Sequence, residues 1–109
     1  MIKGIGVDIA KISRFVDKNT HFIERVLSMK ERHVFYSLNE ENKITYLASR
    51  FSAKEALFKA YKNLNFDFAD VSVLNKENGE PFIEFDSPDV IHISMSHDGD
   101  YVVTYVIVE

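Results

Sequence analysis

Residues 50–60 read Arg50-Phe51-Ser52-Ala53-Lys54-Glu55-Ala56-Leu57-Phe58-Lys59-Ala60, and this stretch predicts part of a long amphipathic helix. At about 100° per residue, one side of that helix carries apolar side chains: Ile44, Leu47, Ala48, Phe51 and Phe58. Glu55 projects from the middle of this apolar stripe. Because a carboxylate in an apolar setting is costly unless it is paired or binds a metal, Glu55 is a candidate functional residue.

The helical pattern around this stretch extends from Glu40 to about Tyr61. Two shorter helices are predicted before it, over residues 20–27 and 29–38. Thr20 is expected to begin the first of them. Ser28 is expected to cap the second, with Glu31 as its capping-box partner three residues on. The middle of the chain is therefore predicted to be helical.

The N-terminal residues 2–9 predict a buried strand that ends at Asp8. Gly4 and Gly6 weaken a strand, and glycines in such positions often mark a close approach of another backbone or a ligand. Asp8 has two interpretations at this point. It either contributes a side chain to a functional site, or it caps a helix over residues 10–16.

Beyond residue 70 the period of the pattern changes from helical to alternating. Residues 71–74 and 81–85 flank Asn78-Gly79, a strong hairpin signal in which both turn positions are expected to have positive φ. A second alternating pair, residues 90–96 and 101–108, follows. One strand, a helical middle and two consecutive hairpins predict an α+β fold, with an antiparallel sheet packed against one long helix plus short helices.

Composition limits the class of protein. The chain has 109 residues, so we expect one domain over residues 1–109, and 46% apolar residues can form a core. The net charge of −4 and the lack of a basic run argue against nucleic-acid binding. No apolar run predicts a membrane span or signal sequence, and the absence of cysteine fits a reducing compartment. We therefore expect a cytoplasmic protein that does not enter a membrane.

The chemistry of the site follows from spacing. Glu55 and Lys59 lie one helical turn apart, which in a surface setting would be an ordinary ion pair. The place of Glu55 in the apolar stripe favours another interpretation. With Asp8 at a strand end, and with Lys54, Arg50 and Lys59 nearby, the residues suit a site where carboxylates hold Mg²⁺ and cations neutralise phosphate.

His97 differs from the other histidines. It lies at the end of a predicted strand, just before the turn at residues 98–100, and strand ends and loops often carry binding groups. The remaining three lie in ordinary amphipathic patterns: His21, His33 and His92. His97 is therefore a candidate binding residue.

Four blocks of the sequence together resemble a known family. They are Gly4-Ile5-Gly6-Val7-Asp8-Ile9, Arg50-Phe51-Ser52-Ala53-Lys54-Glu55-Ala56, Asn78-Gly79-Glu80-Pro81 and Ile93-Ser94-Met95-Ser96-His97. Their order and spacing, and the length of the chain, resemble those of the holo-acyl-carrier-protein synthases, the short single-domain 4′-phosphopantetheinyl transferases. The resemblance covers the whole chain and implies the fold of that family.

The resemblance also implies a reaction. Such enzymes transfer the 4′-phosphopantetheine moiety of coenzyme A to a serine of apo-acyl carrier protein, release adenosine 3′,5′-bisphosphate, and serve fatty acid biosynthesis and lipid metabolism. By resemblance, Asp8 and Glu55 bind Mg²⁺, and Lys59 contacts the diphosphate, so these three are the catalytic residues. Either Glu55 or a metal-bound water could take the proton of the serine.

The remaining roles come from the resemblance as well. It implies that coenzyme A contacts Lys54, Lys59, Ser96 and His97, and that Arg14 faces the acidic carrier protein. It further implies a homotrimer with active sites at subunit interfaces.

Two departures from the family pattern have consequences. The segment 62–66 has no glycine, whereas the family has a glycine-containing loop there, so the resemblance does not define how this loop contacts coenzyme A. Residues 11–25 also carry few cations, so recognition of the carrier protein is expected to be weaker or more hydrophobic. Two other functions are compatible with the residues: a binding module for coenzyme A or a carrier protein, and a structural α+β subunit in which Asp8 only caps a helix.

Overall fold

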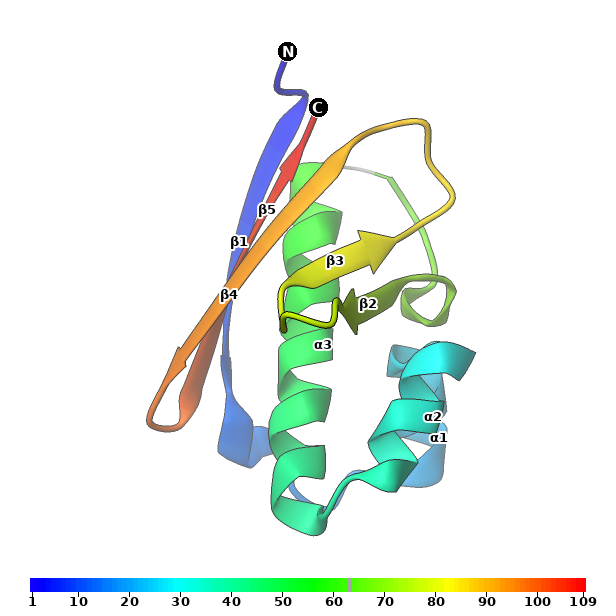
Figure 1. Ribbon diagram of the computed structural model, residues 1–109, viewed down its shortest axis with the longest axis vertical. Coiled ribbons are helices and arrows are strands. Elements are labelled where there is room, and N and C mark those ends of the chain that lie inside the picture. The colour runs from blue at the N-terminus through cyan, green and yellow to red at the C-terminus, as the bar shows by residue number, and fades with distance from the viewer. Residues whose placement is uncertain (63) are drawn as a thin grey trace.

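The computed structural model describes residues 1–62 and 64–109 (Figure 1). A long helix, α3 (Glu40–Ala60), lies between a three-stranded antiparallel sheet on one side and the remaining elements on the other. The predicted α+β class with antiparallel strands and one long helix is confirmed. The glycine-free loop of residues 62–66 includes Asn63, which lies outside the described residues.

The three-stranded sheet has the order β1-β5-β4. Its strands are β1 (Gly4–Lys11), β4 (Ile91–Asp98) and β5 (Tyr101–Val108). Strand β1 runs past Asp8 to Lys11, and Asp8 pairs with Thr104 inside the ladder. The interpretation of Asp8 as the cap of a helix over residues 10–16 is therefore wrong, and only a short 3₁₀ turn, η1 (Ile12–Phe15), follows the strand.

Alternation gives the sheet two different faces. One face of β5 is buried under α3, through residues such as Val102, Thr104 and Val106. The other face is left open within the chain, and Ile5 and Tyr105 are 62% and 52% exposed on it. The long helix thus covers only one side of the sheet, because a single helix cannot cover both.

The two short helices α1 (Thr20–Val26) and α2 (Met29–Ser37) lie on the far side of α3 from the sheet (Figure 1). The predicted start of α1 at Thr20 is confirmed, and the side chain of Asn19, the residue before it, caps the helix by accepting from the amide of Phe22. The capping box of α2, formed by Ser28 and Glu31, is confirmed.

The first hairpin forms a separate two-stranded sheet, β2 (Ser72–Asn75) and β3 (Pro81–Glu84), preceded by the 3₁₀ turn η2 (Phe68–Asp70). Among the described residues of the hairpin turn, only Gly79 has positive φ, at 90°. The prediction that Asn78 shares this conformation is wrong. The turn is a longer loop closed by Lys76 and Glu80, in which a single left-handed residue is sufficient.

Two apolar clusters make the core. One lies between the N-terminal half of α3, the short helices and Val102. The other joins the C-terminal end of α3 to β2 and β5. Helix α3 therefore has buried residues on most of its circumference. None of the helices in the described residues has the length and apolar character to cross a membrane.

Candidate active site

Helix α3 lies directly against the backbone of β1, and two glycines make this contact possible. A Cβ atom at Gly4 would lie 1.8 Å from the carbonyl oxygen of Ala60, and one at Gly6 would lie 1.9 Å from that of Ala56. The prediction that these glycines mark a close approach is confirmed, and the approaching group is the backbone of α3. This contact brings the last two turns of α3 next to Asp8.

Asp8, Glu55 and Lys59 lie together at this contact. The ammonium group of Lys59 donates to the carbonyl oxygen of Val7 at 3.0 Å and to Oδ1 of Asp8 at 3.3 Å. The Lys59 side chain is 52% exposed and that of Asp8 is 15% exposed. Lys59 therefore forms an ion pair with Asp8, and the simple surface pair with Glu55 considered from the sequence is not what forms.

The pKa of the Glu55 carboxyl is raised above that of an ordinary glutamate. Partial burial raises its pKa, and the negative charge of Asp8 raises it further, whereas Lys59 lowers it. Glu55 is half-buried at the edge of the helix-sheet contact. Two carboxylates that repel each other in a partly dry setting form a place where a cation would be stabilising.

The strand-helix contact is reinforced by buried hydroxyl groups. Thr104 of β5 donates to Ser52 of α3 at 3.0 Å, and Ser52 donates to the carbonyl oxygen of Asp8 at 3.4 Å. Ser52 and Thr104 are fully buried. They fix α3 against both strands beside the carboxylates. Sequence reasoning missed this pair because Ser52 and Thr104 are far apart in the chain.

Arg50 and Lys54 do not join the carboxylates as expected. The guanidinium of Arg50 donates to the carbonyl oxygen of Val73 and to Asn75, and stacks 4.0 Å from the ring of Tyr46. Lys54 has no exposed surface. The prediction that these two cations surround Glu55 is wrong, because both point away from β1 and into the layer formed by the short helices and β2.

Lys54 forms a buried ion pair with Glu31 of α2. Its ammonium group also donates to the carbonyl oxygens of Val26 at 2.6 Å and Phe68 at 2.9 Å. Burial lowers the pKa of Lys54 to about 8, and Glu31 opposes that effect. All three donors are occupied, so a direct contact between Lys54 and coenzyme A would require one of these bonds to break.

The other predicted site residues lie elsewhere in the chain. Ser96 and His97 are exposed on β4, which β5 separates from β1. The register places Ser96 opposite Val103, on the open face of the sheet, whereas Asp8 belongs to the face toward α3. Arg14 is exposed in η1. His97 pairs with Val102 and shares the face of Asp8, but β5 lies between their two strands.

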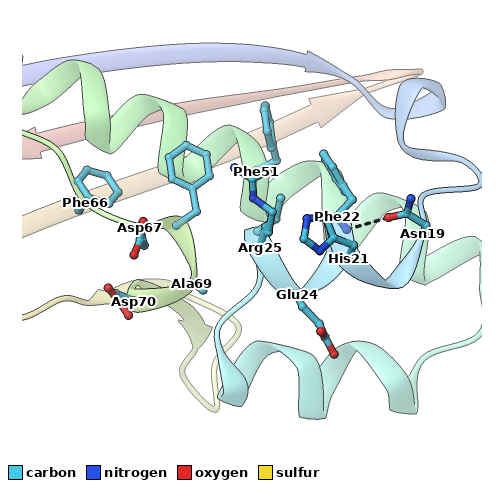
Figure 2. Close-up of a pocket in the computed structure, with 12 residues that line it drawn as sticks. Asn19, His21, Phe22, Glu24, Arg25, Phe51, Phe66, Asp67, Ala69 and Asp70 are labelled. Carbon is cyan, nitrogen blue, oxygen red and sulfur yellow. Dashed lines mark hydrogen bonds between the residues drawn. The ribbon is translucent and has the colours of Figure 1, made fainter.

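A pocket of about 820 Å³ lies between α1 and the segment 66–70 (Figure 2). One wall is α1 and the other is the segment 66–70, with Phe51 of α3 between them. Its lining mixes aromatic rings, among them Phe22 and Phe66, with charged groups at the edge. Phe51, which lines the pocket, precedes Glu55 by one helical turn on α3. Sequence reasoning did not identify this pocket, since its walls are distant in the chain.

The fold and this site define a class of transferase. A sequence profile of the 4′-phosphopantetheinyl transferase superfamily matches residues 4–106, and the chain belongs to that superfamily. Among its relatives, the holo-[acyl-carrier-protein] synthase of Geobacillus sp. (strain WCH70) is 40% identical over 116 residues, with 100% of this chain and 98% of that protein covered. The synthase of the same name from Bacillus pumilus (strain SAFR-032) is 36% identical over 117 residues, with 100% and 97% covered.

Solved structures have the same fold. The crystal structure of a holo-(acyl-carrier-protein) synthase from Bacillus anthracis str. Ames in complex with CoA (3′,5′-ADP) has a TM-score of 0.93 and 34% identity, over 100% of this chain and 97% of that one. The synthase from Neisseria meningitidis has a TM-score of 0.89 and 28% identity, over 100% and 99%. The family and the fold predicted from the sequence are confirmed.

Proposed function

We propose that this chain is a holo-[acyl-carrier-protein] synthase, which transfers the 4′-phosphopantetheine arm of coenzyme A to a serine of an apo-acyl carrier protein and releases adenosine 3′,5′-bisphosphate. The grouping of Asp8, Glu55 and Lys59 at one contact carries this proposal, together with relatives of this name along the full chain. We place the reaction in the cytoplasm, as a step of fatty acid biosynthesis.

Asp8 and Glu55 are proposed to bind Mg²⁺ together with the diphosphate of coenzyme A. The donor set fits this ion, because Mg²⁺ prefers hard oxygen ligands and is often held by one or two carboxylates plus substrate phosphates. The raised pKa of Glu55 also fits, since a cation between the two carboxylates would relieve their repulsion. When bound, Mg²⁺ would neutralise charge that develops on the leaving phosphate.

Lys59 is proposed to bind the same diphosphate of coenzyme A. More than half of its side chain is exposed, so its ammonium can turn from Asp8 toward a ligand. A positioned ammonium stabilises negative charge in the transition state of phosphoryl-type transfer. Either Glu55 or a water at the metal would take the proton of the attacking serine.

We propose that the enzyme is a homotrimer whose sites lie between subunits. The open face of the three-stranded sheet supports this, because it exposes apolar side chains that no element of the chain covers in the described residues: Ile5, Val7, Ile9 and Tyr105. Ser96 is on that same face, opposite in direction to Asp8. A neighbouring copy packed on this face would therefore bring Ser96 to the coenzyme A bound at the other copy's carboxylates. His97, which pairs with Val102 on the face of Asp8, is proposed to contact coenzyme A at the end of β4.

Arg14 is proposed to contact the carrier protein. It is exposed on η1, which directly follows the strand that carries Asp8. A cation at this place complements an acidic partner and would guide the carrier serine toward the carboxylates.

The proposal is tested with fluorescent coenzyme A and a purified apo-acyl carrier protein. We expect transfer of the fluorescent arm in the presence of Mg²⁺, loss of transfer with a chelator, and recovery when Mg²⁺ is added in excess. Asp8→Asn and Glu55→Gln should each lower the rate by about 100-fold or more while the circular dichroism spectrum is kept. Binding of coenzyme A without transfer to any of several carrier proteins would instead identify a binding module. Full activity of both variants would refute the site.

A further inference from the structure

The pocket lined by Phe51 has two walls, and the side chain of Lys54 hydrogen-bonds to the backbone of both. One wall is α1, and the other is the segment 66–70 that includes η2. Lys54 is a buried residue of α3, the helix that also carries Phe51. Its ammonium donates to the carbonyl oxygen of Val26, where α1 ends, and to that of Phe68, where η2 begins.

Both acceptors are backbone atoms at element ends. The last carbonyl groups of a helix have no partner within the helix, and a cation at that end also interacts favourably with the helix dipole. The carbonyl oxygen of Phe68 also accepts from the amide of Val71. Lys54 therefore links the end of α1 to the start of η2.

Lys54 itself is held rigidly from the other side. Glu31 is fully buried, and besides Lys54 its carboxylate accepts from the amides of Ser28 at 2.8 Å and Val73 at 2.7 Å. These bonds anchor the carboxylate to α2 and β2. The ammonium of Lys54 is thus fixed to three elements and is not available as a mobile surface cation.

We propose that Lys54 is a positioning residue, which holds the α1 and η2 walls of the pocket at a fixed spacing and thereby sets the affinity of the enzyme for coenzyme A. This inference rests on the proposed function. Phe51 lines the pocket and precedes Glu55, a carboxylate proposed for the diphosphate, by one helical turn, so the arm that extends from the diphosphate passes between these walls. Lys54 acts through the walls and does not contact the substrate.

Two variants separate this role from stability. Glu31→Gln keeps the volume of the side chain but removes the counter-ion, and its NH2 group replaces an oxygen that accepts from the amide of Ser28 or Val73. Both variants carry this change, so the difference between them isolates Lys54, which in Glu31→Gln keeps donors for both wall carbonyls even as a neutral amine. The double variant Lys54→Met/Glu31→Gln has no buried unpaired charge, whereas Lys54→Met alone would leave Glu31 unpaired and risks misfolding. We therefore expect the double variant to fold, and it lacks the bonds of Lys54 to the walls.

The first readout is steady-state kinetics of transfer by the full chain with Mg²⁺. Relative to wild type, we expect Glu31→Gln to keep the KM for coenzyme A within about twofold and the double variant to raise it by about tenfold, the effect of losing two hydrogen bonds that shape the site. The kcat should change less than KM in the double variant. Equal KM values in the two variants would overturn the inference.

The second readout does not depend on activity. Amide hydrogen exchange of Asp70 and Val71 reports on η2, because these amides donate to Asp67 and Phe68. We expect faster exchange at both amides in the double variant than in Glu31→Gln, and unchanged exchange would overturn the inference. If wild type transfers no phosphopantetheine, the proposed function is wrong, while the exchange comparison still tests the role of Lys54.

Discussion

A methyl group at Gly6 would separate the two halves of the active site. A Cβ atom there would lie 1.9 Å from the carbonyl oxygen of Ala56 and 2.8 Å from the amide nitrogen of Ala60. Both are backbone atoms, so no change of rotamer can relieve the clash. Ordinary contact begins at 3.4 Å, so α3 must move from β1 by about 1.5 Å in Gly6→Ala.

This displacement has a cost in stability and a cost in rate. Overpacking of a tight contact destabilises a protein by about 1–3 kcal/mol, which for a chain of this length lowers the melting temperature by about 4–8 °C for each kcal/mol. The shift also carries Glu55 and Lys59 away from Asp8. A misplacement of about 1 Å at a reacting centre lowers the rate by about 100-fold.

Thermal unfolding and the rate of fluorescent phosphopantetheine transfer measure the two effects. Gly79→Ala is a matched control, because Gly79 has a φ of +90° but no atom within 4 Å of the added methyl group. The control should lose about 1 kcal/mol of stability through backbone strain and keep its transfer rate. If Gly6→Ala has the melting temperature and the rate of wild type, α3 does not pack on β1 as described.

Two further predictions concern charge and assembly. Because the folded state raises the pKa of Glu55, it binds more protons than the unfolded state above pH 4.5, so this group lowers stability as pH rises through that window. Glu55→Gln should therefore raise the melting temperature at pH 7 relative to wild type but not at pH 4, as calorimetry at both values would show; a lower melting temperature at pH 7 would contradict the assignment. Tyr105→Asp should dissociate the proposed trimer in light scattering, whereas Tyr36→Asp, at a side chain of similar exposure on α2, should not. The same mass for both variants would refute the assembly face.

Local patterns predicted most of the secondary structure. The long helix, the capping box of α2 and both hairpins were found because capping and periodicity depend on neighbours within a few residues. The errors also lie at local features. The turn at Asn78 and the continuation of β1 past Asp8 each depended on the choice between two local conformations, which the sequence pattern alone did not decide.

The interior role of Lys54 could not be read from the helical pattern. A wheel with one apolar stripe assumes that one face of the helix is buried, but α3 is covered by the sheet on one side and by the short helices and β2 on another. Lys54 and Arg50 are therefore inside, and their partners come from distant segments. Glu31 was predicted as a capping residue, and nothing near it in the sequence indicates its ion pair.

The sequence by itself determined that Glu55 lies out of place in an apolar stripe, that Lys59 follows one turn later, and that the chain resembles one family. These follow from the fixed geometry of a helix and from motif spacing. Tertiary structure alone decided that Asp8 meets Glu55 and Lys59, since that contact requires β1 and α3 to approach across Gly4 and Gly6. It also decided which cations face the carboxylates, because burial depends on every layer around a helix.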